Sequence, residues 1–311
     1  MSSDHSRLRT LYFFIYIEIY SKFTAEKPEG SLSESAIPPP LVPKAGRRSG
    51  KLRTAGGGGG HMRTIAALIL REMSSRYGRT PGGYIWAILE PLGMILMLSF
   101  GFALVMKSPP LGNSFLLFYA TGYLPFSLFL RSSNTIMAAL TYSGPLLKYP
   151  AVTWFDAVAA RAILNILTDL LVAYILMASI LFFVDSKTII EFGPILLSFA
   201  LAALLAIGVG LVNCVAFSFF PIWRTFWNIF TRPLFLASGI IWLFRDLPQL
   251  AQDILWWNPL VHVTGLARTG YYPTYDPQHV SVVFVLVPGL VLTALGLLLL
   301  RRYQLWILNR T

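Results

Sequence analysis

The chain has 311 residues, of which 55% are apolar and 13% are charged, and its mean hydropathy is +0.63. A soluble domain carries about 25% charged residues, so this composition indicates a membrane protein. The formal charge of +11 does not indicate a nucleic-acid binder, because nine of the 25 Lys and Arg fall in residues 1–61 and the other 16 are spread thinly at the edges of apolar runs. The single Cys214 excludes an intrachain disulfide, and the four histidines lack metal-ligand spacing, so we predict no metal site.

Residues 1–61 differ in composition from the rest of the chain. They contain three consecutive prolines, a basic stretch and a run of glycines, at Pro38–Pro40, Arg47–Arg53 and Gly56–Gly60. Such a segment cannot bury a core and is typical of disorder. Its apolar stretch Leu11–Tyr20 is too short to cross a bilayer; the alternative, a signal peptide, lacks a clean cleavage site. We expect 1–61 to be a disordered or mis-assigned extension, and 62–311 to be the membrane domain.

The segment Met62–Tyr77 is predicted to form an amphipathic helix. Its apolar residues Ile65, Leu68, Ile69 and Met73 recur at helical spacing, and charged residues occupy the other positions. Such a helix is too charged to cross a membrane and is typical of one that lies in the cytoplasmic interface. The stretch Arg79–Gly83 then breaks it.

Six apolar runs follow, each near the roughly 20 residues that cross a bilayer as a helix. They are Tyr84–Met106, Phe115–Leu140, Ala162–Val184, Gly193–Phe217, Trp227–Phe244 and Val280–Leu300. Six crossings place both chain ends on one side of the membrane. Eleven Lys and Arg fall at one set of helix ends and four at the other, so the positive-inside rule predicts cytoplasmic termini. The fold class is therefore an all-α membrane protein.

Two connections between these runs are unusually apolar. The outer one, Arg245–His279, predicts two short helices, one beginning near Pro248 and one capped by Asn258 and running to about Gly270. We interpret it as a re-entrant hairpin that borders a pathway; the alternative is an interfacial aromatic belt. The inner one, Thr141–Arg161, is a stiff apolar stretch that favours a cytoplasmic partner, with a segment lying flat on lipid as the alternative.

Two charges lie deep in predicted helices. Arg131 and Asp169 each sit roughly 12–14 Å from the same inner surface, at 1.5 Å per residue. Intramembrane charges pair or face a cavity, so we predict that these two pair or line one polar cavity, in a structural or a transport role. Glu90, near the inner end of the first crossing, could meet Arg76 or Arg79.

Some expected motifs of energy-coupled proteins are absent from the sequence. There is no G-x-x-x-x-G-K-[ST] phosphate-binding loop, no crossing with several acids, and no clear repeat between the two halves. If this protein pumps a substrate, we expect the energy to come from another chain.

Two stretches resemble those of a known family. Arg76–Pro91 (RYGRTPGGYIWAILEP) is similar to the opening signature of type-2 ABC exporter permeases for capsular polysaccharide and O-antigen, and Leu247–His262 (LPQLAQDILWWNPLVH) is similar to their hairpin before the last crossing. The resemblance covers about Met62–Thr311. The matching motif residues are Arg79, Trp86, Glu90, Pro91, Asn258 and Pro259.

This resemblance implies a homodimer in which each copy docks on a separate ATPase subunit that binds ATP and Mg²⁺, while this chain holds no cofactor. A polysaccharide, usually lipid-linked, would pass between the two copies, with periplasmic and outer-membrane export proteins as further partners. The implied ATPase-coupling residues are Arg71, Arg76, Lys148, Tyr149, Pro150, Trp154 and Phe155. The implied outer mouth of the channel comprises Trp242, Phe244, Trp256, Trp257, Tyr271 and Tyr272, on which sugar rings would stack.

Two alternatives remain open from the sequence. One is a related permease for another substrate, such as teichoic acid, a lipid or a drug. The other is a membrane-embedded glycosyl or acyl transferase, which should carry acid and base residues at one membrane face. The outer acids Asp246, Asp253 and Asp276 are scattered, which disfavours the enzyme.

Overall fold

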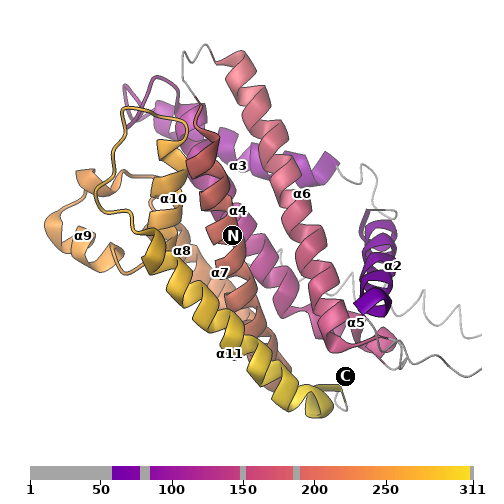
Figure 1. Cartoon of the computed structure of the whole chain (residues 1–311). Coiled ribbons are helices and arrows are strands. Elements are labelled where there is room, and N and C mark those ends of the chain that lie inside the picture. The colour runs from indigo at the N-terminus through magenta and orange to yellow at the C-terminus, as the bar shows by residue number, and fades with distance from the viewer. Residues whose placement is uncertain (1–57, 78–84, 148–151, 185–189, 309–311) are drawn as a thin grey trace, which may run out of the picture. The chain divides into compact units, whose positions relative to one another are not determined.

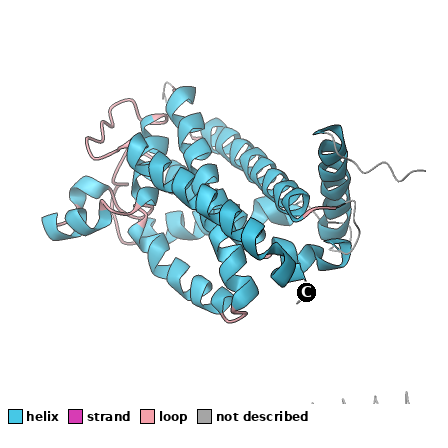
Figure 2. Ribbon diagram, turned by 60° about the horizontal axis from the view of Figure 1, so that its bottom comes forward, coloured by secondary structure: helices cyan, strands magenta, loops and turns pink. Residues whose placement is uncertain are grey.

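A computed structural model describes residues 58–77, 85–147, 152–184 and 190–308. The chain divides into two units, Met1–Leu52 and Arg53–Thr311, and all described residues belong to the second. Within these residues the structure contains helices and connecting loops but no strand (Figure 2). This agrees with the all-α class that the sequence predicts.

Four of the described helices are long and apolar enough to cross a membrane. They are α3 (Ile85–Ala103), α6 (Trp154–Phe183), α7 (Phe192–Phe219) and the first 23 residues of α11 (Val282–Leu308). Helices α7 and α11 lie side by side (Figure 1), and small residues allow this close approach: a Cβ at Gly208 of α7 would lie 2.9 Å from the carbonyl oxygen of Gly289 on α11.

Helix α4 (Phe115–Met137) is the central helix of the described bundle. It has 23 residues, enough to cross a bilayer, but Arg131 and the polar stretch Ser132–Thr135 lower its apolar character, and it is not among the four. Sixteen of its residues are buried against α3, α6, α7 and α10 (Pro259–Thr269). Because protein rather than lipid surrounds much of this helix, its polar side chains can find polar partners.

The fifth predicted crossing is wrong in its length. We expected Trp227–Phe244, whereas α8 spans Trp223–Ala237, 15 residues that rise only about 22 Å. Ser238 caps this helix, and Gly239 then adopts a φ of +69°, the left-handed conformation that commonly ends helices and that glycine tolerates best.

The connection predicted to lie on the outer side, Arg245–His279, contains the two short helices that the sequence predicts. After a single 3₁₀ turn, η1 (Phe244–Asp246), α9 spans Gln249–Leu255 and α10 spans Pro259–Thr269. The side chain of Asn258 accepts a hydrogen bond from the Leu260 amide, and Pro259 occupies the first turn, where its missing N–H costs nothing. Helix α9 contains no buried residue, whereas α10 is buried against α4 and α7.

Helix α2 (Gly58–Tyr77) packs along α6, as Figure 1 shows. It begins four residues before Met62, and the proposed start of the domain there stays a prediction. The predicted break after this helix lies in residues 78–84, outside the described part. Helix α5 (Ala139–Leu147) follows α4 directly, and a capping box of Thr153 and Asp156 then starts α6.

Candidate functional site

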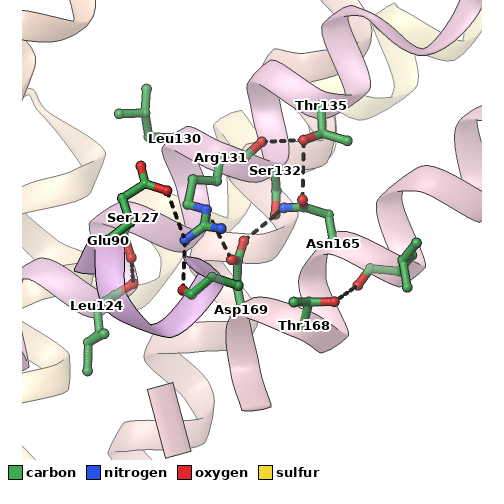
Figure 3. A network of polar contacts seen from close by, with 12 residues as sticks. Glu90, Leu124, Ser127, Leu130, Arg131, Ser132, Thr135, Asn165, Thr168 and Asp169 are labelled. Atoms are coloured by element: carbon green, nitrogen blue, oxygen red, sulfur yellow. Dashed lines mark hydrogen bonds and ion pairs between the residues drawn. The ribbon is translucent and has the colours of Figure 1, made fainter. Parts of the chain in front are cut away.

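The two intramembrane charges predicted from the sequence lie together in the structure (Figure 3). Nε of Arg131, on α4, is 3.4 Å from Oδ1 of Asp169, on α6. The Asp169 side chain is only 5% exposed, and its Oδ2 accepts a hydrogen bond of 2.8 Å from Nδ2 of Asn165, one turn earlier. A buried carboxylate with a cation and an amide donor around it is well compensated.

Asn165 extends this network along the interface between α4 and α6. Its Nδ2 also donates to Oγ of Ser132 at 3.1 Å, and its Oδ1 accepts a hydrogen bond of 3.2 Å from Oγ1 of Thr135. Figure 3 shows these side chains pointing toward one another between the two helices. The polar part of α4 thus serves to bind α6.

Glu90, on α3, approaches Arg131 from the other side. Its Oε2 lies 3.9 Å from Nη1 of Arg131, and its side chain is 71% exposed, against 21% for Arg131. The same Nη1 donates a long hydrogen bond of 3.5 Å to the Ala87 carbonyl. The sequence suggested Arg76 or Arg79 as the partner of Glu90; neither of those side chains is described.

A second buried ion pair was missed by the sequence analysis. Nε of Arg161, on α6, donates to Oε1 of Glu72, on α2, at 2.9 Å, and both side chains are almost fully buried. Nη1 of Arg161 also donates to the Thr135 carbonyl at 3.3 Å, and the guanidinium lies 4.2 Å over the ring of Tyr142 on α5. Helical periodicity placed Glu72 off the apolar face, so no sequence signal pointed to this burial.

The aromatic residues predicted for the outer mouth divide into exposed and buried sets. Trp242 and Trp257 are exposed, and Trp257 lies edge-on to the half-buried Trp256 at 5.5 Å between ring centroids. Tyr271 and Tyr272, in contrast, are buried in the hydrophobic core. In this single copy the loop before α4 lies against Tyr272, since a Cβ at Gly112 would be 2.5 Å from its ring. The placement of both tyrosines near the outer mouth stays a prediction.

Phe244 stacks on His279, with 4.1 Å between ring centroids. His279 lies in the connection before α11, outside the spanning helices. Burial lowers the pKa of His279 to about 4, with smaller contributions from the nearby His262 and Arg268. The ring is therefore neutral at pH 7 and can remain stacked in an apolar setting.

The non-helical backbone after α8 is bonded by side chains of the hairpin. Nδ2 of Asn258 donates to the Ala237 carbonyl at 3.0 Å, and Oγ1 of Thr264 donates to that of Ser238 at 2.8 Å. Nη2 of Arg268, a buried residue of α10, donates to the Ile240 carbonyl at 2.9 Å. These bonds replace those that a continuing helix would make, which sequence reasoning could not anticipate because it extended α8 through this stretch.

An apolar groove of about 520 Å³ opens beside this region. Its wall is formed mainly by α8, the hairpin and α11, and it includes four aromatic side chains, Phe129, Trp227, Phe230 and Trp257. The residues that line this groove are aromatic or apolar apart from Asn258, and none of them is charged. Such a surface offers ring faces to a ligand without a fixed ionic contact.

The predicted docking residues are described only in part. On α2, Arg71 is exposed. Phe155 is 47% exposed and lies edge-on to the half-buried Trp154 at 6.0 Å between ring centroids. The side chain of Arg76 and residues Lys148, Tyr149 and Pro150 lie outside the described part, as does Arg79.

Of the remaining motif residues, Trp86 is exposed on α3 and Pro91 is buried inside the same helix.

Comparison with known proteins gives a family match and several relatives. Residues 63–272 match the model of the family described as ABC-2 type transporter. The chain is 33% identical over 238 residues to the polysialic acid transport protein KpsM of Escherichia coli, covering 76% of this chain and 92% of that protein. It is 29% and 28% identical over 243 residues to the capsule polysaccharide export inner-membrane proteins CtrC of Neisseria meningitidis and BexB of Haemophilus influenzae, covering 78% of this chain and 91% of each.

Proposed function

Because the chain belongs to the ABC-2 type transporter family, we propose that it is the inner-membrane permease subunit of an ATP-driven exporter of capsule polysaccharide. The observation that carries this proposal is the similarity to two capsule polysaccharide export proteins and a polysialic acid transport protein, over more than three quarters of the chain. The chain is the membrane subunit rather than the ATPase, so ATP and Mg²⁺ belong to a partner ATPase, which an ABC-2 permease requires.

The permease crosses the membrane six times, with both termini in the cytoplasm. The crossings are α3, α4, α6, α7, α8 and α11. Helix α8 is too short to cross alone, and the non-helical stretch 238–243 completes its path. The hydrogen bonds from α10 to that stretch support a re-entrant hairpin, because bare backbone groups at membrane depth need partners from the protein.

Two copies form the translocation pathway between them, and α3 borders it. The support is Glu90, whose carboxylate is 71% exposed although it lies about 8 Å along a membrane-spanning helix. A carboxylate that faces hydrocarbon is unfavourable, so this face of α3 meets water or the second copy. The exposed apolar residues Met97 and Phe100 continue along α3 toward its outer end.

Sugar rings leave past the outer aromatic residues Trp242, Phe244, Trp256 and Trp257. The exposure of Trp242 and Trp257 supports this, since their faces are free to stack on the apolar faces of sugars. Such contacts tolerate sliding of a polymer.

The ATPase docks on α2 and on the inner loop, through Arg71, Arg76, Lys148, Tyr149, Pro150, Trp154 and Phe155. Periplasmic and outer-membrane export proteins then receive the polymer. The buried pair of Glu72 and Arg161 supports a mechanical role for α2, because it fixes this helix to α6.

Deletion of the gene tests the proposal. Cells that lack the permease should retain capsule polymer in the cytoplasm and lose it from the surface, and the wild-type gene should restore both. The tagged permease should also co-purify with an ATPase subunit. If the deletion leaves surface capsule unchanged and a different polymer or lipid accumulates instead, the assigned substrate is wrong.

A further inference from the structure

We propose that Arg131 binds the anionic groups of an acidic polysaccharide in the inner part of the pathway, and that Glu90 is the counter-ion that the polymer displaces. This inference rests on the proposed function and narrows its substrate to a polymer that carries carboxylate or phosphate groups. It differs from the stacking surface of the outer aromatic residues, which does not distinguish acidic from neutral sugars.

The two acids around Arg131 are not equivalent. Asp169 is buried, lies 3.4 Å from Nε, and is held in place by Asn165. It fixes one edge of the guanidinium and lowers the cost of keeping a cation at membrane depth. Nothing from solution can replace this carboxylate without entering the interface between α4 and α6.

Glu90 is held much more loosely. Its carboxylate lies 3.9 Å from Nη1, at the limit of an ion pair, and its side chain is 71% exposed (Figure 3). Exposed pairs of this kind contribute little to stability, since solvent screens them and the side chain loses entropy on pairing. An incoming anion can therefore take the place of Glu90 at small cost.

The chemistry of the guanidinium suits this exchange. Arg131 remains 21% exposed, and its Nη1, on the side of Glu90, donates only a long hydrogen bond of 3.5 Å to the Ala87 carbonyl. Because Asp169 occupies Nε, the Nη1 and Nη2 groups are the pair that can bind a carboxylate or a phosphate through two hydrogen bonds. A neutral sugar hydroxyl forms weaker hydrogen bonds with a cation that already has two carboxylate partners. The site therefore favours acidic repeat units.

Glu90 also prevents the polymer from binding too tightly. The group of Glu90, Arg131 and Asp169 carries a net charge of −1 when all three are ionised. When Glu90 returns to the guanidinium it competes with the bound anion, so each repeat unit can leave and the next can bind. A single cation without such a competitor would hold one unit in place.

Binding of a labelled acidic polymer tests this inference on the purified exporter complex without ATP. The probes are fluorescent polysialic acid, which is named as the cargo of one relative, and a neutral dextran of equal length. Anisotropy at low salt should show that Arg131→Gln weakens polysialic acid binding at least tenfold, whereas Glu90→Gln strengthens it up to about fivefold. Arg301→Gln removes an exposed positive charge on α11 and should leave binding unchanged.

Arg131→Lys keeps the positive charge but loses the planar guanidinium, so it should weaken polysialic acid binding less than Arg131→Gln does. This second variant separates loss of binding from misfolding of Arg131→Gln, and gel filtration and ATPase co-purification show whether each variant is folded. The inference is overturned if Glu90→Gln weakens polysialic acid binding, if dextran binds as tightly as polysialic acid, or if the wild-type complex binds neither. In each case the capsule phenotype of the deletion still decides the proposed function independently.

Discussion

The buried ion pair between Glu72 and Arg161 should be a strong attachment of α2 to the helical bundle. It acts beside the 2.8 Å hydrogen bond between Nδ1 of His61 and Oδ1 of Asp156. The Nε–Oε1 distance is 2.9 Å, and the two side chains are 7% and 10% exposed. Removing one partner of a buried pair leaves an uncompensated charge and costs about 3–5 kcal/mol. Glu72→Gln should therefore destabilise the permease by about 3 kcal/mol, since the guanidinium keeps its bond to the Thr135 carbonyl and its contact with Tyr142.

For a chain of this size such a loss corresponds to roughly 6–12 °C in melting temperature. The assay is thermal unfolding of the detergent-purified protein, followed by fluorescence-detected gel filtration. Glu191→Gln makes the same chemical change at an exposed position, where the side chain forms no cap bond, and should leave the melting temperature within about 1 °C.

A double-mutant cycle separates the pair from the individual residues. Glu72→Gln with Arg161→Gln should cost clearly less than the two single changes added together, because the second change removes the charge that the first left unpaired. The assignment of this contact as an attachment of α2 would be refuted by either of two results. One is a double variant whose destabilisation equals the sum of the two single changes, and the other is a melting temperature of Glu72→Gln equal to that of Glu191→Gln.

Four further outcomes are expected. Gly239→Ala should lower the melting temperature by several degrees, because a φ of +69° costs about 1–2 kcal/mol for a residue with a Cβ; an unchanged melt would mean that the turn relaxes. Trp257→Ala should reduce surface capsule several-fold at unchanged protein level, whereas Trp257→Phe should retain most of it; equal export by both would remove Trp257 from the outer mouth. Trp154→Ala should leave insertion intact but uncouple ATP hydrolysis from export, and normal export would contradict the docking site. Burial lowers the pKa of His279 to about 4, so between pH 6.5 and 4 the unfolded chain binds more protons than the folded one. The stability that this histidine contributes is full above pH 6.5 and should fall as the pH drops across this window. His279→Phe should flatten the pH dependence of the melting temperature, and a profile identical to wild type would contradict the shift.

The sequence predicted most helices because apolar length and helix caps are local signals. The cap at Asn258 and the turn before α10 are fixed by neighbouring residues, so both short outer helices were predicted. The pairing of Arg131 with Asp169 was predicted from depth alone, since both had to lie at one level in an apolar environment.

The errors have a different physical origin. The end of α8 depends on one glycine inside an apolar run, where composition alone gives no reason to stop. The burial of Glu72 depends on its partner Arg161, 89 residues away in the sequence, and helical periodicity within one segment does not predict such a distant contact. The burial of Tyr271 and Tyr272 likewise depends on tertiary packing, which the family resemblance that placed them near the outer mouth does not reveal.

The polar character of α4 has a consequence for how the protein is made. An arginine inside a helix opposes its release into lipid, by up to about 2.5–3.5 kcal/mol at a central position on insertion scales. The exposed Glu90 of α3 pairs only loosely with Arg131, and its buried partner Asp169 is on α6, which the ribosome has not yet delivered when α4 emerges. A nascent chain that ends before Asp169 should therefore keep α4 at the translocon, and the two helices should enter the bilayer as a pair.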